Sequence, residues 1–416
     1  MRLKFVHAAD LHLDAPFVGL READEEVSAR LREATFRAYD RVIDLCLKEK
    51  VDFAVFAGDV FNSQNKTVRS QSAFAKGLGR LADAGIPAFI AHGNHDPVGE
   101  WSESFRWPTL ARRFGAGEVE GFPVVRDGQV ACQVYGISFP RQKVLENLAL
   151  RFRRADGAPF AVGVLHANVG GQMEYDSYAP CSVADLDVVG LDYWALGHIH
   201  RRLDLKAARP AIVYAGNTQG LTPNEAGPRG CCLVTLAEDE EPLVEFRPTA
   251  PAVWRQEALS IAGVSGEQEL VDAAEATIAG AVAEAECDLI LLRLRLEGAG
   301  PLHGRMGRRD LEETLRDLGR EASPMVWVES LLDETRPEID LESRAGGEDF
   351  VGQFLRLAEA ALGDAVLGGE LQDEIGDLLR EREVVEAVQP SPELVQGWLE
   401  RARVLGAELM VREREA

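Results

Sequence analysis

Five apolar runs in this chain are each followed by polar residues of the kinds that bind metal ions. The runs cover residues 3–8, 53–57, 87–91, 160–165 and 193–196, and their lengths and compositions predict β-strands. The polar residues after them are Asp10 and His12, Asp59, Asn94 to Asp96, His166, and His198 with His200. Because open α/β sheets keep their active sites at the carboxyl ends of strands, we expect these side chains to meet at one edge of a sheet.

This combination of residue types favours a site for two divalent metal ions that acts on phosphate esters. Two ions roughly 3.5 to 4 Å apart clamp a phosphodiester, activate a water for in-line attack and stabilise the leaving oxygen. A carboxylate such as Asp59 is the natural bridge between them. Carboxylate, imidazole and carbonyl donors suit Mn²⁺ best here, with Fe or Zn²⁺ as alternatives. No cysteine lies in the motifs, which argues against a zinc ribbon or an iron–sulfur site.

Each motif alone has an ordinary structural explanation. An isolated Asp-Leu-His or Gly-Asp is usually a turn or a satisfied polar group. The run Gly93-Asn94-His95-Asp96 is equally compatible with a turn, because Gly and Asn tolerate left-handed conformations. Five motifs in this order, each ending a predicted strand, favour the metal site. His7 and His92 fall outside the ligand positions and are expected to be structural or to support the ligands.

The residues around these positions resemble those of a known family, the calcineurin-like metallophosphoesterases, and within it the SbcD and YhaO group of DNA-repair exonucleases. The matching stretches are 5–14, 57–61, 93–97, 165–166 and 196–200. The stretches 214–220 and 227–231 resemble the YhaO branch most. The resemblance covers residues 1–250 well and the remainder only in layout.

The resemblance implies an α/β fold, a four-layer αββα metallophosphoesterase sandwich. It implies that one metal is held by Asp10, His12, Asp59 and His200. It also implies that Asp59 bridges to a second metal, held by Asn94, His166 and His198. His95 resembles the catalytic histidine of the family, which contacts the scissile phosphate and protonates the leaving oxygen without binding metal. Asp96 is expected to orient or charge that imidazole.

Composition and charge add two expectations. The N-terminal residues enter a strand directly, with no long apolar stretch, so we expect a cytoplasmic protein without a membrane anchor and with reduced cysteines. The net charge of −24 opposes binding to DNA as a whole. Local basic residues offer phosphate contacts, and the alternative is that they form a solvated surface. These residues are Arg141, Lys143, Arg151, Arg153, Arg154, Arg201 and Arg202.

The organisation of the chain changes twice after the motifs, which predicts three parts. Residues 1–250 form the catalytic domain. Residues 251–336 alternate strand and helix and form a small α+β cap, with Ser265 and Gln268 placed as a capping box. In SbcD-like proteins such a cap helps to select the nucleic acid; elsewhere it would be a substrate lid or a structural appendage. Residues 337–416 have two helical patterns, 349–382 and 392–414, that pack either on this chain or on a partner.

The function expected from the sequence is therefore a two-metal phosphodiesterase, most simply a Mn²⁺-dependent DNA exonuclease or endonuclease subunit in DNA repair. One alternative is a phosphoesterase for nucleotides or phospholipid precursors, with the cap as its lid. A second is a scaffold subunit for an SMC-type ATPase, which an intact ligand set argues against. The resemblance implies DNA and a coiled-coil ATPase of the SbcC/YhaN type as partners, and a homodimer is compatible with it.

Overall fold

The computed structural model describes residues 1–20, 23–62, 67–99, 101, 107–303, 308–337, 341–364, 369–370, 374 and 391–415. The chain divides into two compact units. The first contains Met1–Glu257, Ile278–Arg293 and Arg316–Ser330, and the second contains Ala258–Thr277, Leu294–Leu315 and Leu331–Ala416. No described helix has an apolar stretch long enough to cross a membrane.

The first unit contains two six-stranded sheets. In the first sheet the order is β12-β11-β1-β2-β3-β4, and β1 to β4 run parallel. Its strands are β1 (Arg2–Ala8), β2 (Phe53–Ala57), β3 (Ala88–Ala91), β4 (Ala111–Arg113), β11 (Gly230–Ala237) and β12 (Glu240–Pro248). The antiparallel strand β11 pairs with β1 and brings the late part of the chain beside the first motif.

The second sheet has the order β5-β6-β7-β8-β10-β9, with a parallel centre and an antiparallel strand at each edge. Its strands are β5 (Glu120–Arg126), β6 (Gln129–Gly136), β7 (Phe160–His166), β8 (Tyr193–Gly197), β9 (Leu203–Lys206) and β10 (Ala211–Tyr214). The five strands predicted before the motifs are therefore all present, with ends that differ by one residue at most.

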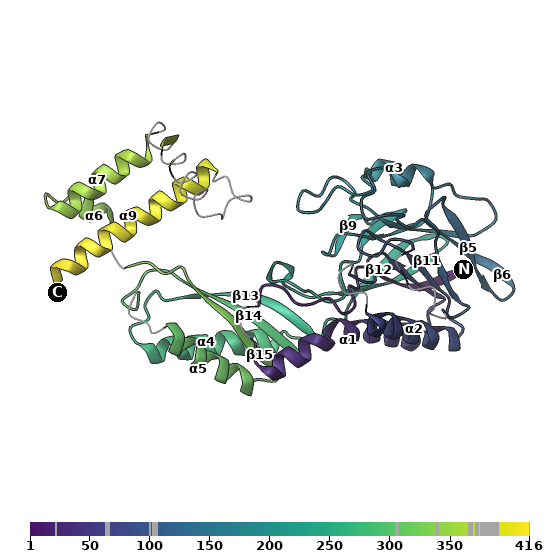
Figure 1. The fold of residues 1–416 in the computed structure, drawn as a ribbon, viewed down its shortest axis with the longest axis horizontal. Coiled ribbons are helices and arrows are strands. Elements are labelled where there is room, and N and C mark those ends of the chain that lie inside the picture. Colours follow the sequence, from purple (N-terminus) through teal and green to yellow (C-terminus); the bar gives the residue numbers. More distant parts are fainter. Residues whose placement is uncertain are drawn as a thin grey trace. The chain divides into compact units, whose positions relative to one another are not determined.

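The two sheets pack face to face and form the predicted αββα sandwich. The apolar layer between them includes Phe5, Phe53, Val162 and Tyr193, and each of these is fully or nearly fully buried. Helices α1 (Glu25–Glu49) and α2 (Val68–Asp83) cover the outer face of the first sheet. The outer face of the second sheet is covered by α3 (Val183–Asp187), the short helix η1 (Leu148–Arg151) and loops, so this fourth layer is thin (Figure 1).

The cap segment has the element order predicted from sequence. It runs β13 (Ala252–Ser260), α4 (Glu267–Ala283), β14 (Leu289–Glu297), α5 (Arg308–Glu321) and β15 (Met325–Asp333), and the three strands form one sheet. The predicted capping box needs a correction. The Ser265 backbone N–H and hydroxyl both donate to Glu269, at 2.8 and 3.0 Å, whereas Gln268 donates to Asp272. A carboxylate accepts both hydrogen bonds, so Glu269 is the preferred partner at this helix start.

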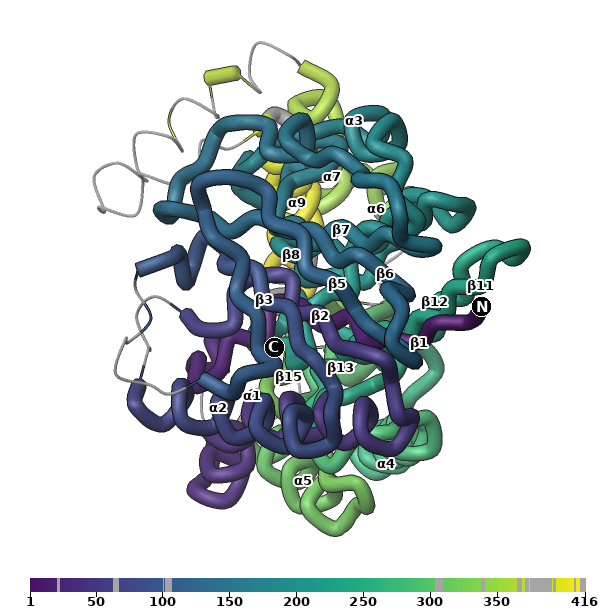
Figure 2. Tube along the Cα trace, turned by 90° about the vertical axis from the view of Figure 1, so that its right-hand side faces the viewer, coloured from purple at the N-terminus to yellow at the C-terminus, as the bar shows by residue number. Residues whose placement is uncertain are grey.

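The C-terminal segment contains α6 (Leu341–Ala345), α7 (Phe350–Leu362) and α9 (Pro392–Glu415). The predicted helix 349–382 is shorter than expected, because α7 begins at the N-cap Asp349 and ends at the C-cap Gly363. Much of its predicted second half, residues 365–368, 371–373 and 375–382, lies outside the described residues. Helices α7 and α9 share a small core around Val351, Leu355 and Ala407. Both appear in the 90° view of the tube (Figure 2).

Candidate metal centre

The predicted ligands follow strand ends in strained backbone conformations. Asp10, His12, Asp59 and His198 have positive φ angles of 49°, 42°, 48° and 98°. Such conformations cost roughly 1 to 3 kcal/mol each in non-glycine residues and persist where surrounding contacts fix them. The Asp10 N–H donates to Gly58 O at 3.2 Å and the His12 N–H to Asp59 O at 3.0 Å. The first two motifs therefore hold each other in place.

The structure brings all seven predicted ligand residues together. The donor atoms of Asp10, His12 and His200 lie within 4.8 Å of one another, and so do those of Asp10, Asp59 and His166. Asn94 Oδ1 lies 2.9 Å from His166 Nε2. His198 also belongs to this cluster. Its ring centroid lies 5.1 Å from that of His166, and its backbone N–H donates to the Asp10 carboxylate.

Asp59 occupies the middle of this cluster. Its Oδ2 lies 3.3 Å from His166 Nε2 and 4.0 Å from His12 Nε2, so one carboxylate faces donors from both predicted metal positions. On the other side, His12 Nε2 and His200 Nε2 are only 3.2 Å apart. Two imidazole nitrogens this close, when neither carries a proton, are the arrangement expected around a cation.

Three of the histidines have one ring nitrogen bound to the protein, which leaves the other available to a metal. His166 Nδ1 donates to Ala57 O at 3.0 Å, and His198 Nε2 donates to Asp176 O at 2.7 Å. His200 Nδ1 donates to Glu225 at 2.5 Å. A hydrogen bond of this kind fixes the tautomer and the ring orientation of a metal-binding histidine. His12 differs, since its buried Nδ1 has no hydrogen-bond partner in the described part of the chain.

Burial and mutual charge shift the ionisation of these groups. Burial raises the pKa of Asp10 to about 6 and lowers the pKa of His12 to about 3. Burial alone would lower the pKa of His166, but the carboxylates of Asp59 and Asp10 outweigh it and raise the pKa to about 9. The same contact with His166 overcomes the effect of burial on Asp59 and lowers its pKa. A buried carboxylate held ionised in this way is suited to binding a cation.

Glycines around the cluster leave room for the side-chain donors. A Cβ atom on Gly93 would lie 2.2 Å from Asp59 Oδ1, and one on Gly58, which has a φ of +91°, would lie 2.2 Å from His166 Nδ1. A Cβ on Gly197 would meet Ala57 O at 1.7 Å. Two carboxylates, four imidazoles and one amide oxygen, packed this closely without intervening side chains, fit two divalent metal ions.

His95 and Asp96 follow Asn94 and have different environments. His95 is half-buried, its N–H donates to Asp59 Oδ1 at 2.8 Å, and its ring centroid lies 5.2 Å from that of His12. Asp96 is fully buried, and its carboxylate accepts from the N–H groups of Val60, Phe61 and Gly93 at 2.9, 3.3 and 2.9 Å. Burial raises the pKa of Asp96 to about 8. Asp96 therefore joins the two motif loops, instead of contacting the His95 ring as the sequence led us to expect.

Two histidines outside the ligand positions have structural contacts. His7 Nδ1 accepts from the Tyr193 hydroxyl at 3.0 Å and its Nε2 donates to Leu196 O at 3.1 Å, which links β1 to β8 across the two sheets. His92 Nδ1 contacts Asp96 O at 2.8 Å.

Sequence reasoning missed Glu225, which holds His200. Glu225 ends the short helix η2 (Pro223–Glu225), and its contact with Thr222 is a capping box of the form Thr-x-x-Glu. That pattern was available in the sequence, but nothing in it shows that the carboxylate also reaches a histidine 25 residues earlier.

The predicted basic residues are in mixed surroundings. Arg151 pairs with Glu146 at 2.6 Å, Arg154 with Asp192 at 3.2 Å, and Arg202 with Asp204 at 2.5 Å, so carboxylates already offset these three charges. Arg141 and Arg153 donate to backbone carbonyl groups and remain exposed. Lys143 and Arg201 are also exposed. The Ala179 N–H donates to Val144 O, so the segment with Arg141 and Lys143 lies beside the loop that brings Asp176 to His198.

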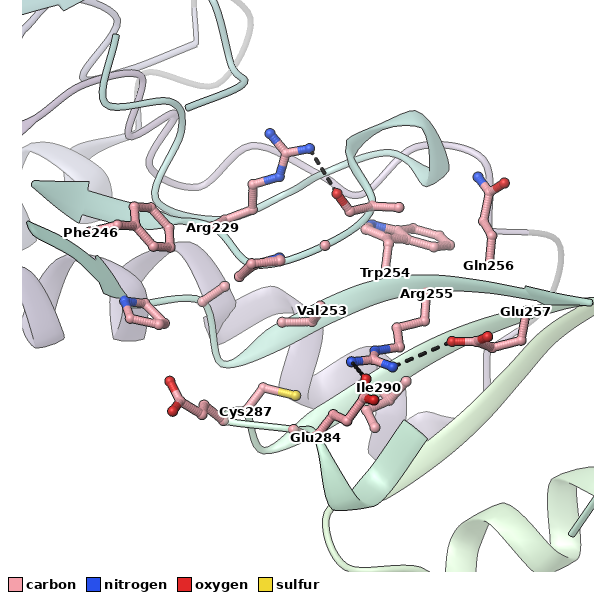
Figure 3. Close-up of a pocket in the computed structure, with 17 residues that line it drawn as sticks. Arg229, Phe246, Val253, Trp254, Arg255, Gln256, Glu257, Glu284, Cys287 and Ile290 are labelled. Carbon is pink, nitrogen blue, oxygen red and sulfur yellow. Dashed lines mark hydrogen bonds and ion pairs between the residues drawn. The ribbon is translucent and has the colours of Figure 1, made fainter. Parts of the chain in front are cut away.

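A separate cavity of about 690 Å³ lies along β13 and is lined in part by Arg229, Trp254 and Cys287. None of the seven predicted ligands lines it. Arg255 also lines the cavity and forms ion pairs with Glu257 and Glu284 (Figure 3). This cavity is therefore distinct from the metal centre.

Comparison with known proteins defines the class. The calcineurin-like phosphoesterase family matches residues 3–202, which include all seven predicted ligands, and the middle domain of metallophosphoesterase YhaO matches residues 254–336. The chain is 34% identical over 373 residues to the uncharacterized metallophosphoesterase YhaO of Bacillus subtilis, which covers 88% of this chain and 90% of that protein. The chain thus belongs to the calcineurin-like metallophosphoesterases of the YhaO type and is a metal-dependent phosphoesterase.

More distant relatives are named as a DNA repair protein and as a nuclease subunit. The DNA double-strand break repair protein Mre11 of Aeropyrum pernix is 29% identical over 262 residues, 58% of this chain and 60% of that protein. The SbcD component of the nuclease SbcCD from Bacillus subtilis is 23% identical over 294 residues, 62% of this chain and 70% of that protein. Among solved structures, a dimetal phosphatase from Danio rerio aligns with a TM-score of 0.36 and 11% identity over 58% of this chain and 98% of that chain.

Proposed function

We propose that this protein is a Mn²⁺-dependent DNA nuclease, an exonuclease or endonuclease that acts in DNA repair. The observation that carries the proposal is the convergence of the seven donor residues, four of them in strained backbone conformations, at the ends of strands from two sheets. The names of the Mre11 and SbcCD relatives add DNA as the substrate class. Phosphoesterase chemistry follows from the family, whereas DNA, manganese and repair are our proposals.

In this proposal Asp10, His12, Asp59 and His200 hold one ion, and Asp59, Asn94, His166 and His198 hold the other. When bound, two divalent ions supply the positive charge that polarises a phosphodiester and favours attack by water. The protein keeps the donors in position. Ala57 O, Asp176 O and Glu225 each hold one imidazole, so the rings have little freedom to turn.

His95 is the proposed general acid. It is partly exposed, stands beside His12 and has its backbone anchored to the carboxylate of Asp59. From this position its ring would contact the scissile phosphate and protonate the leaving oxygen. Asp96 supports this role indirectly, because it fixes the loop that carries His95 to the loop that carries Asp59.

The exposed cations Arg141, Lys143, Arg153 and Arg201 are the proposed phosphate contacts. They are a small basic set on a chain with a net charge of −24, so affinity for DNA from this chain alone is expected to be weak and sensitive to salt. Arg151, Arg154 and Arg202 contribute less, because each already has a carboxylate partner.

The same charge favours one alternative, a phosphoesterase for nucleotides or phospholipid precursors. A small substrate needs no basic surface beyond the metal centre, and residues 251–336 would then act as its lid. A scaffold role for an SMC-type ATPase remains the second alternative, and the complete donor set argues against it.

A coiled-coil ATPase is the proposed partner, with residues 337–416 as its docking segment. This segment has 8 Arg and 19 Asp plus Glu, a net of 8 minus 19, or −11, so it is unsuited to DNA. It also exposes apolar side chains, including Phe350, Leu357, Leu405 and Leu409, which are 66%, 64%, 55% and 55% exposed. Exposed apolar positions on paired helices suit a protein partner.

The test is to incubate the purified protein with Mn²⁺ and three substrates: labelled single-stranded DNA, labelled double-stranded DNA and a chromogenic phosphodiester. We expect cleavage of DNA and of the small ester, with loss of both after chelation. Hydrolysis of the small ester alone would replace the nuclease proposal with the small-molecule alternative.

A further inference from the structure

The segment from Asn217 to Arg229 contacts His200 from outside the metal centre. His200 Nδ1 donates to Glu225 Oε1 at 2.5 Å, and Asn217 Nδ2 donates to the same oxygen at 3.1 Å. The other oxygen, Oε2, accepts from the N–H groups of Leu221 and Thr222 at 2.5 and 3.1 Å. Four donors thus fix a carboxylate whose side chain is 13% exposed.

The backbone of His200 is held by the same segment. Arg229 Nη1 donates to His200 O at 2.5 Å, and the Asn217 N–H donates to the same oxygen at 3.1 Å. Arg229 also donates to the carbonyl oxygens of Glu225 and Ala226, at 3.1 and 3.2 Å. The Arg229 guanidinium therefore links Glu225, which holds the imidazole, to the backbone of His200, which carries it.

We propose that Glu225 is a positioning residue for the metal held by Asp10, His12 and His200, and that it acts by fixing the tautomer of His200. Because Glu225 only accepts hydrogen bonds when ionised, the proton of His200 stays on Nδ1 and the lone pair of Nε2 faces the metal. His12 lacks such a contact, as its Nδ1 has no partner among the described residues. His200 is then the pre-oriented imidazole of this group. The proposal deepens the proposed metal site and does not depend on DNA as substrate.

Replacement of Glu225 by glutamine tests the tautomer specifically. A glutamine has one oxygen and one amino group, while both carboxylate oxygens of Glu225 accept hydrogen bonds. If the amino group faces His200, the ring must accept at Nδ1 and its proton moves to Nε2, the metal-facing atom. If it faces the other way, it opposes the N–H groups of Leu221 and Thr222. Either orientation weakens the metal position, although the side chain keeps its size.

The measurement is the Mn²⁺ content and affinity of the full-length protein, by metal analysis and calorimetry. We expect Glu225→Gln to lower the affinity for one of the two bound ions by about 10- to 100-fold. Glu225→Asp keeps the charge but has a shorter side chain. It should therefore restore less than half of the loss in binding free energy. The matched control is Glu174→Gln, which removes the same charge from an exposed position in the loop that carries Asp176. This control should bind two ions like the wild type. Unchanged Mn²⁺ affinity in a folded Glu225→Gln protein would overturn the proposal.

A second measurement requires no variant. In the Zn²⁺-loaded wild type, the nitrogen chemical shifts of the His200 ring should show a proton on Nδ1 and the metal on Nε2. Metal on Nδ1, or no proton there, would overturn the proposal even if Glu225→Gln does not fold. Neither experiment measures DNA cleavage. If the protein does not cleave DNA, both results still test the role of Glu225.

Discussion

At the scale of single residues, the contacts of the two ring nitrogens distinguish the structural His7 from the proposed ligand His166. Both nitrogens of His7 are used by the protein, by Tyr193 and Leu196. In His166 one nitrogen is bound to a carbonyl oxygen and the other faces Asp59 and Asn94. A residue of the same type therefore connects two sheets in one place and is a proposed metal donor in the other. Sequence position alone predicts this only where a motif surrounds the histidine.

The first prediction concerns the bridging carboxylate. Asp59 lies between His166 and His12, so Asp59→Asn should remove more metal than His12→Ala, which affects one ion. Metal analysis of the two purified variants tests this. Two ions bound to the Asp59→Asn protein would mean that Asp59 is not the bridge.

The second prediction separates catalysis from metal binding. His95→Ala should keep the metal content of the wild type and lose rate by roughly 10² to 10⁴, because the general acid is lost. His303→Ala is the matched control and should keep both, since His303 lies in the cap segment, outside the metal centre. Loss of metal from the His95 variant, or normal turnover of a substrate with a poor leaving group, would contradict the assigned role.

The third prediction concerns the pH dependence of stability at His7. Burial lowers the pKa of His7 from 6.5 to about 3, so the unfolded chain takes up a proton as the pH falls below 6.5 while the folded protein does not. Stability that is present at neutral pH is lost between these two values, by at most about 1.4 kcal/mol per pH unit. Urea unfolding at several pH values should show a shallower loss in His7→Gln than in the wild type. Equal slopes would exclude His7 as a source of the acid sensitivity.

At the scale of elements, the site depends on loops that join strand ends. Asp96 connects the loop after β3 to the loop after β2, and Glu225 connects η2 to the residues after β8. The strands place each motif at the same edge of its sheet. The loop contacts then orient the side chains that they hold. The contacts of Asp96 with Val60 and of Glu225 with His200 each join residues that are well separated in the chain.

The fourth prediction tests the close approach of two such loops. A Cβ on Gly93 would lie 2.2 Å from Asp59 Oδ1, so Gly93→Ala should displace the bridging carboxylate and lower Mn²⁺ content and phosphodiesterase rate together. Gly117→Ala is the control, because a Cβ there meets no atom within 4 Å. Normal metal content in the Gly93 variant would show that the loops tolerate the added methyl group.

At the scale of the whole molecule, the catalytic layers and the C-terminal helices each have their own apolar packing. The core between the two sheets uses residues from Leu3 to Leu236, whereas α7 and α9 pack around Val351, Leu355 and Ala407. The match to the YhaO middle domain ends at residue 336. We retain residues 1–250, 251–336 and 337–416 as proposed domain limits.

The fifth prediction follows from this separation. A chain that ends at Arg336 should stay folded and hydrolyse a small phosphodiester with Mn²⁺, while losing the proposed coiled-coil ATPase partner. Circular dichroism, ester hydrolysis and co-purification measure the three properties. If the shortened chain unfolds, or still binds the ATPase, the docking surface lies outside residues 337–416.

The sequence by itself determined the strands, their order before the motifs and the candidate metal donors. Short apolar runs that end in Asp, Asn or His are local signals, and the family resemblance adds their assignment to one centre. Only the tertiary structure decided the partners that hold those donors. Glu225 with His200, Asp96 with Val60, and Arg154 with Asp192 are contacts between residues that lie far apart in the chain. Such contacts depend on where separate loops come to lie once both sheets have packed, so periodicity and motif spacing do not predict them.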